Sequence, residues 1–183
     1  PEMMMRSEGT TTYEMAQDRT KYDLEKILES AERVGKAPVA EIAARLTDPD
    51  SGVRFWAVTG LLNNLQEAKP YLPEISKLLN DSSPTVQIAT AELMCKLKSS
   101  DEALPVLEKY ITDERPWLAL YAARTVQMIE KEAQPLKPAI QAAIEKLAIE
   151  PGNRQPHPGS KYIYKDGNFA SFTGWALEGA LQN

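Results

Sequence analysis

The amino-acid sequence predicts an all-α protein, an α-α superhelix built from about four helix pairs. The first observation behind this prediction is an internal repeat. Three similar segments, LTDPDSGVRFWAVTGLL, LNDSSPTVQIATAELM and ITDERPWLALYAARTV, begin at Leu46, Leu79 and Ile111, which are 33 and then 32 residues apart. Shorter apolar segments recur between and after them, each 32 residues from the last, at Leu72, Leu104 and Leu136. A fixed period of roughly 20–50 residues indicates a repeat protein.

The second observation is that apolar residues within each unit follow the period of a helix. The first helix of a unit is short, and the second is longer and follows a turn that contains an aspartate. In two of the longer helices the apolar and small residues are Val53, Trp56, Ala57, Gly60, Leu61 and Leu65, and Leu118, Tyr121, Ala122, Val126 and Ile129. These residues recur every three or four positions, the spacing of an amphipathic helix. We expect Gly60 to allow a neighbouring helix to approach closely.

The third observation is that the phrase Trp-Ala-(Val/Leu)-x-Gly-x-Leu occurs twice, as WAVTGLL from Trp56 and WALEGAL from Trp175. The Trp56 position recurs at Ala89 and Tyr121, so the next copy is due near residue 154 and comes about 21 residues late. We therefore predict a loop inserted at about 150–167. The other expected parts are a linker at 1–20 that follows a preceding domain, the repeat domain at 21–183, a leading helix at 22–34, and a helix at 136–149 paired with a closing helix at 168–182.

Composition excludes several classes of partner. The 183 residues carry a net charge of -5 and no Lys/Arg-rich run, so we expect no nucleic-acid binding. No run of 18 apolar residues is present, so no segment is expected to span a membrane. Cys95 is the single cysteine, which excludes an internal disulfide.

No catalytic or metal-binding set is recognisable in the sequence. His157 is the only histidine and lies between two prolines, without the nucleophile and orienting group that catalysis needs. DPDSG from Asp48 is similar to the start of a calcium loop, but the Gly and Glu that an EF-hand requires are replaced by Val53 and Thr59. We expect this segment to cap a helix and Cys95 to lie in the core. The sequence predicts no catalytic residue, no metal site and no cofactor.

The inserted loop is the most informative surface in the sequence, because the repeat itself does not need it. It carries a mixture of cationic and aromatic residues that suits an interface. These candidate interface residues are Arg154, His157, Lys161, Tyr162, Tyr164 and Lys165. Two alternatives remain open: a surface loop packed on its own protein, or a contact with a neighbouring domain or an anionic ligand.

Two-helix units of this length, with an aspartate in the turn and Val53-Arg54 after it, resemble HEAT-type repeats. The resemblance implies a ladder between units, formed by the turn aspartate and an arginine six residues later. Its expected residues here are Asp48, Arg54, Asp81 and Asp113. Gln87 and Ala119 replace the later arginines, so the sequence does not predict a continuous ladder.

The segments PEMMMRSEGTTTYEMAQD, KYDLEKILESAERVG, LTDPDSGVRFWAVTGLL and SFTGWALEGAL together resemble the C-terminal part of bacterial sulfatases of the arylsulfatase type. The resemblance implies a parent enzyme that uses a formylglycine in (Cys/Ser)-x-Pro-x-Arg and a bound calcium. Neither feature is present here, because Cys95 is followed by Lys-Leu-Lys and Ser82-Ser83-Pro84 by Thr85.

Three hypotheses follow for function. The first is a non-catalytic repeat domain of a sulfatase that packs on the catalytic domain or shapes access to it. The second is a free-standing repeat scaffold that binds another protein along its concave face. The third, an enzyme in its own right, is disfavoured by the missing motifs. The compartment is open, and would be periplasmic or secreted if the sulfatase resemblance holds.

Overall fold

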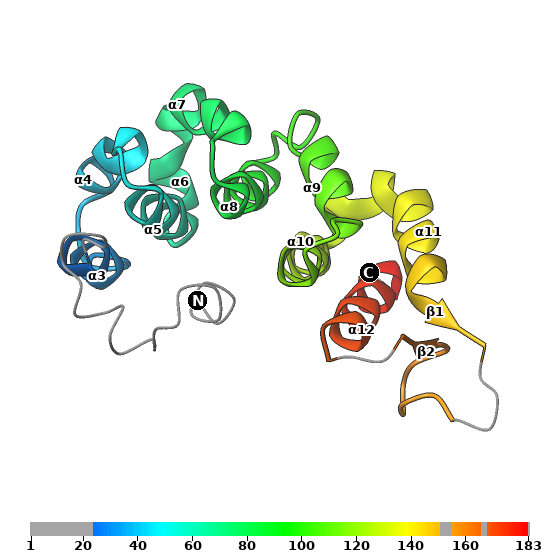
Figure 1. Ribbon diagram of the computed structural model, residues 1–183. Coiled ribbons are helices and arrows are strands. Elements are labelled where there is room, and N and C mark those ends of the chain that lie inside the picture. Colours follow the sequence, from blue (N-terminus) through cyan, green and yellow to red (C-terminus); the bar gives the residue numbers. More distant parts are fainter. Residues whose placement is uncertain (1–23, 151–154, 166–167, 183) are drawn as a thin grey trace.

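The computed structural model describes residues 24–150, 155–165 and 168–182 (Figure 1). The predicted linker at 1–20 and Arg154 of the inserted loop lie outside the described residues. The described helices form an arch of two layers, as an α-α superhelix requires. The predicted fold class is therefore confirmed.

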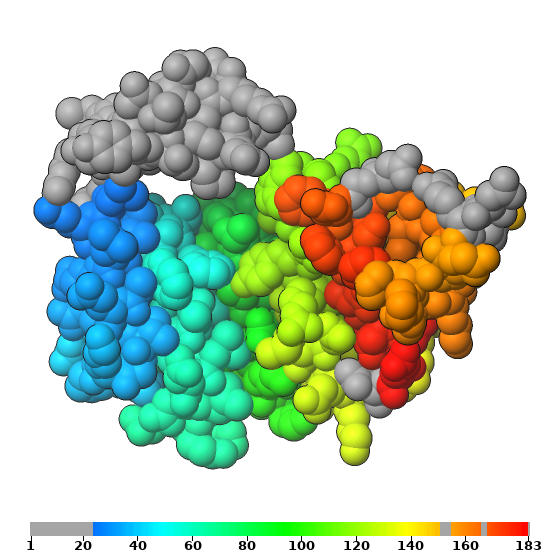
Figure 2. All heavy atoms as spheres, turned by 90° about the horizontal axis from the view of Figure 1, so that it is seen from below, coloured from blue at the N-terminus to red at the C-terminus, as the bar shows by residue number. Residues whose placement is uncertain are grey.

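The inner layer of the arch lines its concave side and consists of five helices in the described part of the chain. They are α3 (Leu24–Glu32), α5 (Ser51–Leu62), α8 (Pro84–Lys96), α10 (Pro116–Met128) and α12 (Asn168–Gln182). Viewed from below, they lie side by side in chain order (Figure 2). Pro84 and Pro116 open α8 and α10, where a missing N–H leaves no hydrogen bond unmade.

The other described helices form the outer layer and the connections. They are α4 (Val39–Ala43), η1 (Ala44–Thr47), α6 (Leu65–Ala68), η2 (Lys69–Tyr71), α7 (Leu72–Lys77), η3 (Leu78–Asn80), α9 (Leu104–Ile111), η4 (Glu130–Leu136) and α11 (Lys137–Leu147). The pairs α4/α5, α7/α8, α9/α10 and α11/α12 correspond to the four predicted units, with α3 leading the stack. One continuous core runs between the layers from Val39 to Ala180.

The start of the inserted loop differs from the prediction, whereas the closing helix α12 begins at the predicted residue, Asn168. The helix expected at 136–149 ends at Leu147, and Ala148–Ile149 form strand β1 instead. This strand pairs antiparallel with β2 (Ile163–Tyr164), with Ala148 opposite Tyr164 and Ile149 opposite Ile163. The Lys165 N–H also donates to the Leu147 carbonyl at 3.0 Å. The ribbon closes the loop because it satisfies backbone groups that the end of α11 leaves free.

Two local predictions concern α5, and the structure agrees with both. The Asp50 carboxylate accepts hydrogen bonds from the N–H groups of Gly52 and Val53, so this segment caps a helix. A Cβ at Gly60 would lie 3.0 Å from a methyl carbon of Ile42, which shows how closely α4 approaches. On the leading helix α3, Leu28 is 60% exposed and lies outside the core.

Candidate functional site

The predicted ladder is built around Arg54, whose side chain links two neighbouring units. Its Nε and Nη2 donate to the two carboxylate oxygens of Asp81 at 2.6 and 2.7 Å. Its Nη1 donates to the carbonyls of Asp48 and Pro49, in the turn before its own helix. Both charged side chains are almost buried, at 11% and 4% exposure. The ion pair therefore fixes the angle between two units, which is a structural task.

The electrostatics of Asp81 follow from this geometry. Burial by itself would raise the pKa of the Asp81 carboxyl, because a charge in the interior loses its hydration. Hydrogen bonds from Arg54 and from the Ser83 N–H outweigh that effect and hold the pKa below its usual range. The carboxylate is therefore charged at neutral pH.

The ladder changes character on either side of this ion pair. Towards the N-terminus, Lys26 Nζ lies 2.6 Å from a carboxylate oxygen of Asp48. Towards the C-terminus, Gln87 replaces arginine, donating to the Asp81 carbonyl and accepting from the Tyr110 hydroxyl at 2.8 Å. Asp113 instead pairs with Arg115 within its own turn, at 2.9 Å. The ionic part of the ladder thus ends after the second unit, as the loss of the later arginines suggests.

The inserted loop is held against α12 by the carboxylate of Glu178, which is only 8% exposed. It accepts from the Ser160 hydroxyl at 2.6 Å, from the Lys161 N–H at 2.8 Å and from the Tyr164 hydroxyl. Three donors thus compensate the burial of one charge. Burial and the hydrogen bond to Glu178 together raise the pKa of the Tyr164 phenol. Glu178 was not singled out in the sequence, because no local pattern marks a helix residue that binds a distant loop.

The aromatic residues of the loop pack on the protein itself. Tyr164 is 5% exposed and its ring lies on Gly174, where a Cβ would come closer than 3.0 Å to three ring atoms. Tyr162 is half-buried, and its hydroxyl accepts from Gln141 at 3.3 Å. The His157 ring lies over Trp175, with ring centroids 4.5 Å apart.

Of the six candidate interface residues, Tyr164 therefore cannot present its ring to a partner. His157, Lys161 and Lys165 remain exposed, and Arg154 lies outside the described residues. The described part of the loop packs on its own protein beside α12 (Figure 1), and its exposed residues leave both alternatives open.

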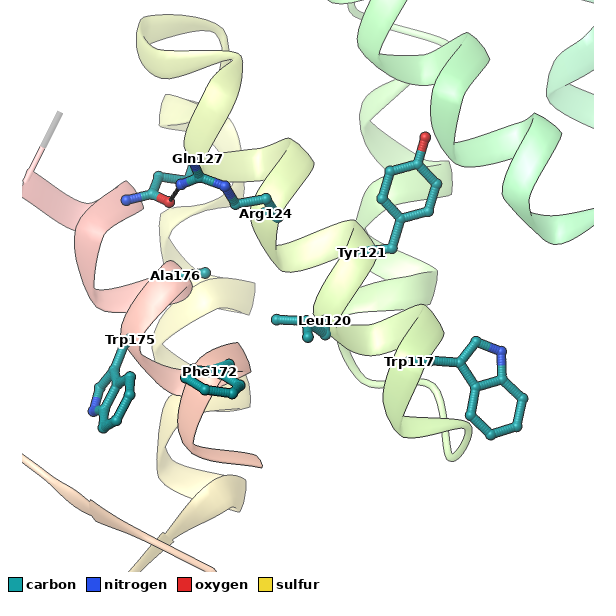
Figure 3. A pocket seen from close by; sticks show the side chains of 8 residues that line it. All are labelled: Trp117, Leu120, Tyr121, Arg124, Gln127, Phe172, Trp175 and Ala176. Atoms are coloured by element: carbon teal, nitrogen blue, oxygen red, sulfur yellow. Dashed lines mark hydrogen bonds between the residues drawn. The ribbon is translucent and has the colours of Figure 1, made fainter. Parts of the chain in front are cut away.

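A second candidate site lies between α10 and α12 on the inner layer, and sequence reasoning did not identify it as a site. It is an open pocket of about 610 Å³. Its lining residues are Trp117, Leu120, Tyr121, Arg124, Gln127, Phe172, Trp175 and Ala176 (Figure 3). Figure 3 shows Leu120 directed to the α12 side of α10 and Tyr121 to the other side, towards the preceding helices.

The exposed large apolar side chains are concentrated on the two helices of this pocket, and Trp117 and Phe172 line it. In the described part of the chain five such residues are exposed, and four of them lie on α10 and α12: Trp117 (39%), Met128 (45%), Phe169 (45%) and Phe172 (49%). Exposed apolar side chains that gather on one surface mark an interaction site, whereas scattered ones do not.

Helix α12 does not bury the whole of its apolar stripe. Helical spacing places Phe169, Phe172, Trp175, Ala176 and Gly179 on one face of the helix. Ala176 is indeed buried, but Phe169 and Phe172 are exposed. The reason is that α10 and α11 cover a face displaced around the helix, and its buried residues are Thr173, Gly174, Ala176, Leu177, Glu178 and Ala180.

Aromatic rings continue along the inner layer beyond the pocket. The ring of Phe55 on α5 lies 5.5 Å from that of Trp56 and 6.4 Å from that of Tyr121 on α10. Helix α8 lies between α5 and α10, and at the position equivalent to Trp56 and Tyr121 it has Ala89. The short side chain leaves room for the two rings to meet. Tyr121 thereby joins the pocket to the aromatic cluster on α5.

Two charged residues set the electrostatics of this surface. Arg124 is exposed and donates a hydrogen bond to Gln127 one turn later, and it forms no ion pair with any residue that the structure describes. Glu92 on α8 lies close enough to Tyr121 for its charge to act on the phenol. Burial raises the pKa of Glu92, and burial together with the charge of Glu92 raises the pKa of Tyr121. The pocket is therefore more favourable to anions at its Arg124 end.

Other chemistry is not evident in residues 24–150, 155–165 and 168–182. Cys95 is fully buried, and burial, with the charges of Glu132 and Glu92, raises the pKa of its thiol to about 12. Such a thiol is neutral at pH 7 and is not a nucleophile. Over the same ranges, no three His, Cys, Asp or Glu residues are grouped as metal ligands, and no helix combines the length and apolarity needed to cross a membrane.

Comparison with known proteins supports the HEAT-like repeat but matches no individual protein. A family model of HEAT repeats matches residues 39–126, which run from α4 to α10. No curated protein and no solved structure matched the chain. The chain thus contains a HEAT-like repeat region, and repeats of this kind use extended concave surfaces to bind other proteins.

Proposed function

We propose that this chain is a non-catalytic scaffold that binds a protein along its concave face. One observation carries the proposal: the exposed aromatic residues of α10 and α12 gather on the inner layer of a HEAT-like arch. Aromatic residues, Met and Arg are enriched in protein interfaces. This surface combines Trp117, Phe172 and Arg124, and the matched repeats supply a curved frame for a partner.

The more specific proposal is that the partner is the catalytic domain of a sulfatase, to which this chain is joined as a C-terminal domain. Its support is the sequence resemblance described above, part of which falls on residues 1–23, outside the described residues. On this proposal the sulfate-ester chemistry belongs to the partner, and the repeat domain packs on it or shapes access to it. A free-standing scaffold is the second candidate, because the aromatic surface suits any protein partner.

Two experiments distinguish these candidates. The reading frame upstream of Pro1 should encode an α/β domain with a (Cys/Ser)-x-Pro-x-Arg motif if the parent is a sulfatase. A start codon near Met3 would favour the free-standing scaffold. The purified chain, assayed with an aryl sulfate and calcium, should show no turnover in either case. Turnover that follows the protein through purification would contradict a non-catalytic role.

A further inference from the structure

The pocket between α10 and α12 has two chemically different ends, and both are visible in Figure 3. Towards the start of both helices it is apolar, lined by Leu120, Phe172 and Ala176 with the ring of Trp117 beyond. Towards the end of α10 it is polar, with Arg124 and Gln127. A ligand that fills the pocket must therefore present an apolar group and a polar group side by side.

The polar end is held in place by contacts within the protein. The Gln127 side chain lies on the backbone of α12 at Gly179, where a Cβ would come closer than 3.0 Å to its Nε2. The Oε1 of the same side chain accepts a hydrogen bond from Arg124. Gln127 thus orients the guanidinium beside the pocket, and this lowers the entropic cost of ordering the Arg124 side chain when a ligand binds.

The charge of Arg124 selects the ligand. It has no carboxylate partner among the described residues, although the chain as a whole carries a net charge of -5. A guanidinium binds a carboxylate through two parallel hydrogen bonds, and such charge-assisted bonds are stronger than neutral ones. A basic ligand would be repelled, whereas an acidic one would supply the missing counter-charge.

We propose that this pocket binds a segment of a partner protein in which an acidic residue stands next to a large apolar residue. The apolar side chain fills the space between Leu120, Phe172 and Ala176, and the carboxylate pairs with Arg124. The inference rests on the proposed function, since it names the chemistry of the protein segment that the concave face binds. It also assigns the site to α10 and α12 and not to the inserted loop.

The test uses the full 183-residue chain and two fluorescein-labelled ten-residue peptides that share a Trp-Leu core. One peptide has Glu residues on both sides of the core and the other has Lys residues. Fluorescence anisotropy should show the Glu peptide binding at least fivefold more tightly. Arg124→Glu should abolish or reverse this preference, and Phe172→Ala should weaken binding of the Glu peptide at least fivefold.

A matched control separates the site from the overall charge. Lys77→Glu makes the same change of charge on α7, in the outer layer, at an exposed residue. It should leave the preference for the Glu peptide unchanged. Arg124 and Phe172 are exposed, so their variants should fold, and circular dichroism melting checks this.

Three outcomes would overturn the inference: binding of neither peptide, equal binding of both, or equal effects of Lys77→Glu and Arg124→Glu. A fourth is a dimer of the wild-type chain that Phe172→Ala dissociates in sedimentation, because a second copy would then occupy the pocket. None of these results would refute the scaffold proposal, which fails if no protein contacts the concave face.

Discussion

Replacing Gly174 with alanine should destabilise the C-terminal end of the stack. The Tyr164 ring lies on Gly174, and a Cβ there would come closer than 3.0 Å to the Cζ, Cε1 and Cε2 atoms. The residue is in the middle of α12, so the backbone cannot retreat without disturbing the packing on α10 and α11. The ring must therefore move, although it is 5% exposed and tied to the buried Glu178.

The cost can be bounded from both sides. Forcing extra volume into a packed core costs about 1–3 kcal/mol. Removing a large aromatic side chain from a core altogether costs about 3–5 kcal/mol. Since the displaced ring loses part of its burial and its hydrogen bond to Glu178, we expect about 3 kcal/mol. For a chain of this size, that corresponds to a fall in melting temperature of about 6–12 °C.

The assay is urea and thermal unfolding followed by circular dichroism, with two comparisons. Gly60→Ala is the matched control, because its Cβ would meet methyl carbons of Ile42 at 3.0 and 3.3 Å and of Val34 at 3.7 Å, and alanine is the better helix former. We expect that change to cost less than about 1 kcal/mol. In the background of Tyr164→Ala, Gly174→Ala should cost almost nothing, because the clash is gone. A Gly174→Ala variant as stable as wild type, or costs that simply add, would refute the reasoning.

Two further predictions concern the ladder and the closing helix. Asp81→Asn should destabilise by about 1.5–3 kcal/mol, because it leaves Arg54 without its charged partner. Since the pKa of Asp81 is lowered in the folded state, this ion pair stabilises fully above the ordinary pKa of about 4 and is lost as the pH falls through the lowered value. Unfolding at a series of pH values should show a steeper loss below pH 4 for wild type than for the variant, and parallel curves would contradict it. Deleting residues after Gly167 should cause aggregation or loss of cooperative unfolding, because α12 covers both α10 and α11; a soluble, equally stable truncation would contradict that role.

The repeat could be predicted from the sequence because it depends on local spacing that is written three times. Leu72, Leu104 and Leu136 mark the period, and the buried positions Val53 and Leu118 recur within it. This regularity can be recognised in the sequence without knowing the contacts between units. The fold class and the inner helices could therefore be predicted from it.

The binding surface could not be predicted in the same way, because it depends on which neighbour covers each helix. Phe172 has the spacing of a core residue and is exposed only because α10 and α11 cover a different face of α12. A weak signal did exist for Trp117, which directly precedes Leu118 and thus lies off the apolar stripe of α10. The contact of Glu178 with Ser160 joins residues whose pairing is decided by the course of the loop, and no periodic pattern indicates it.

The central claim is that a protein binds the concave face. It is tested most directly by site-specific photo-crosslinking in cells that make the full-length protein. The photoreactive residue benzoylphenylalanine replaces Phe172 on the inner layer or, in a matched variant, the exposed Glu108 on α9 in the outer layer. The account predicts that irradiation joins position 172, and not position 108, to one defined protein segment, whether in the partner domain of the same chain or in a separate protein. Equal crosslinking at both positions, or crosslinking at position 108 alone, would contradict it.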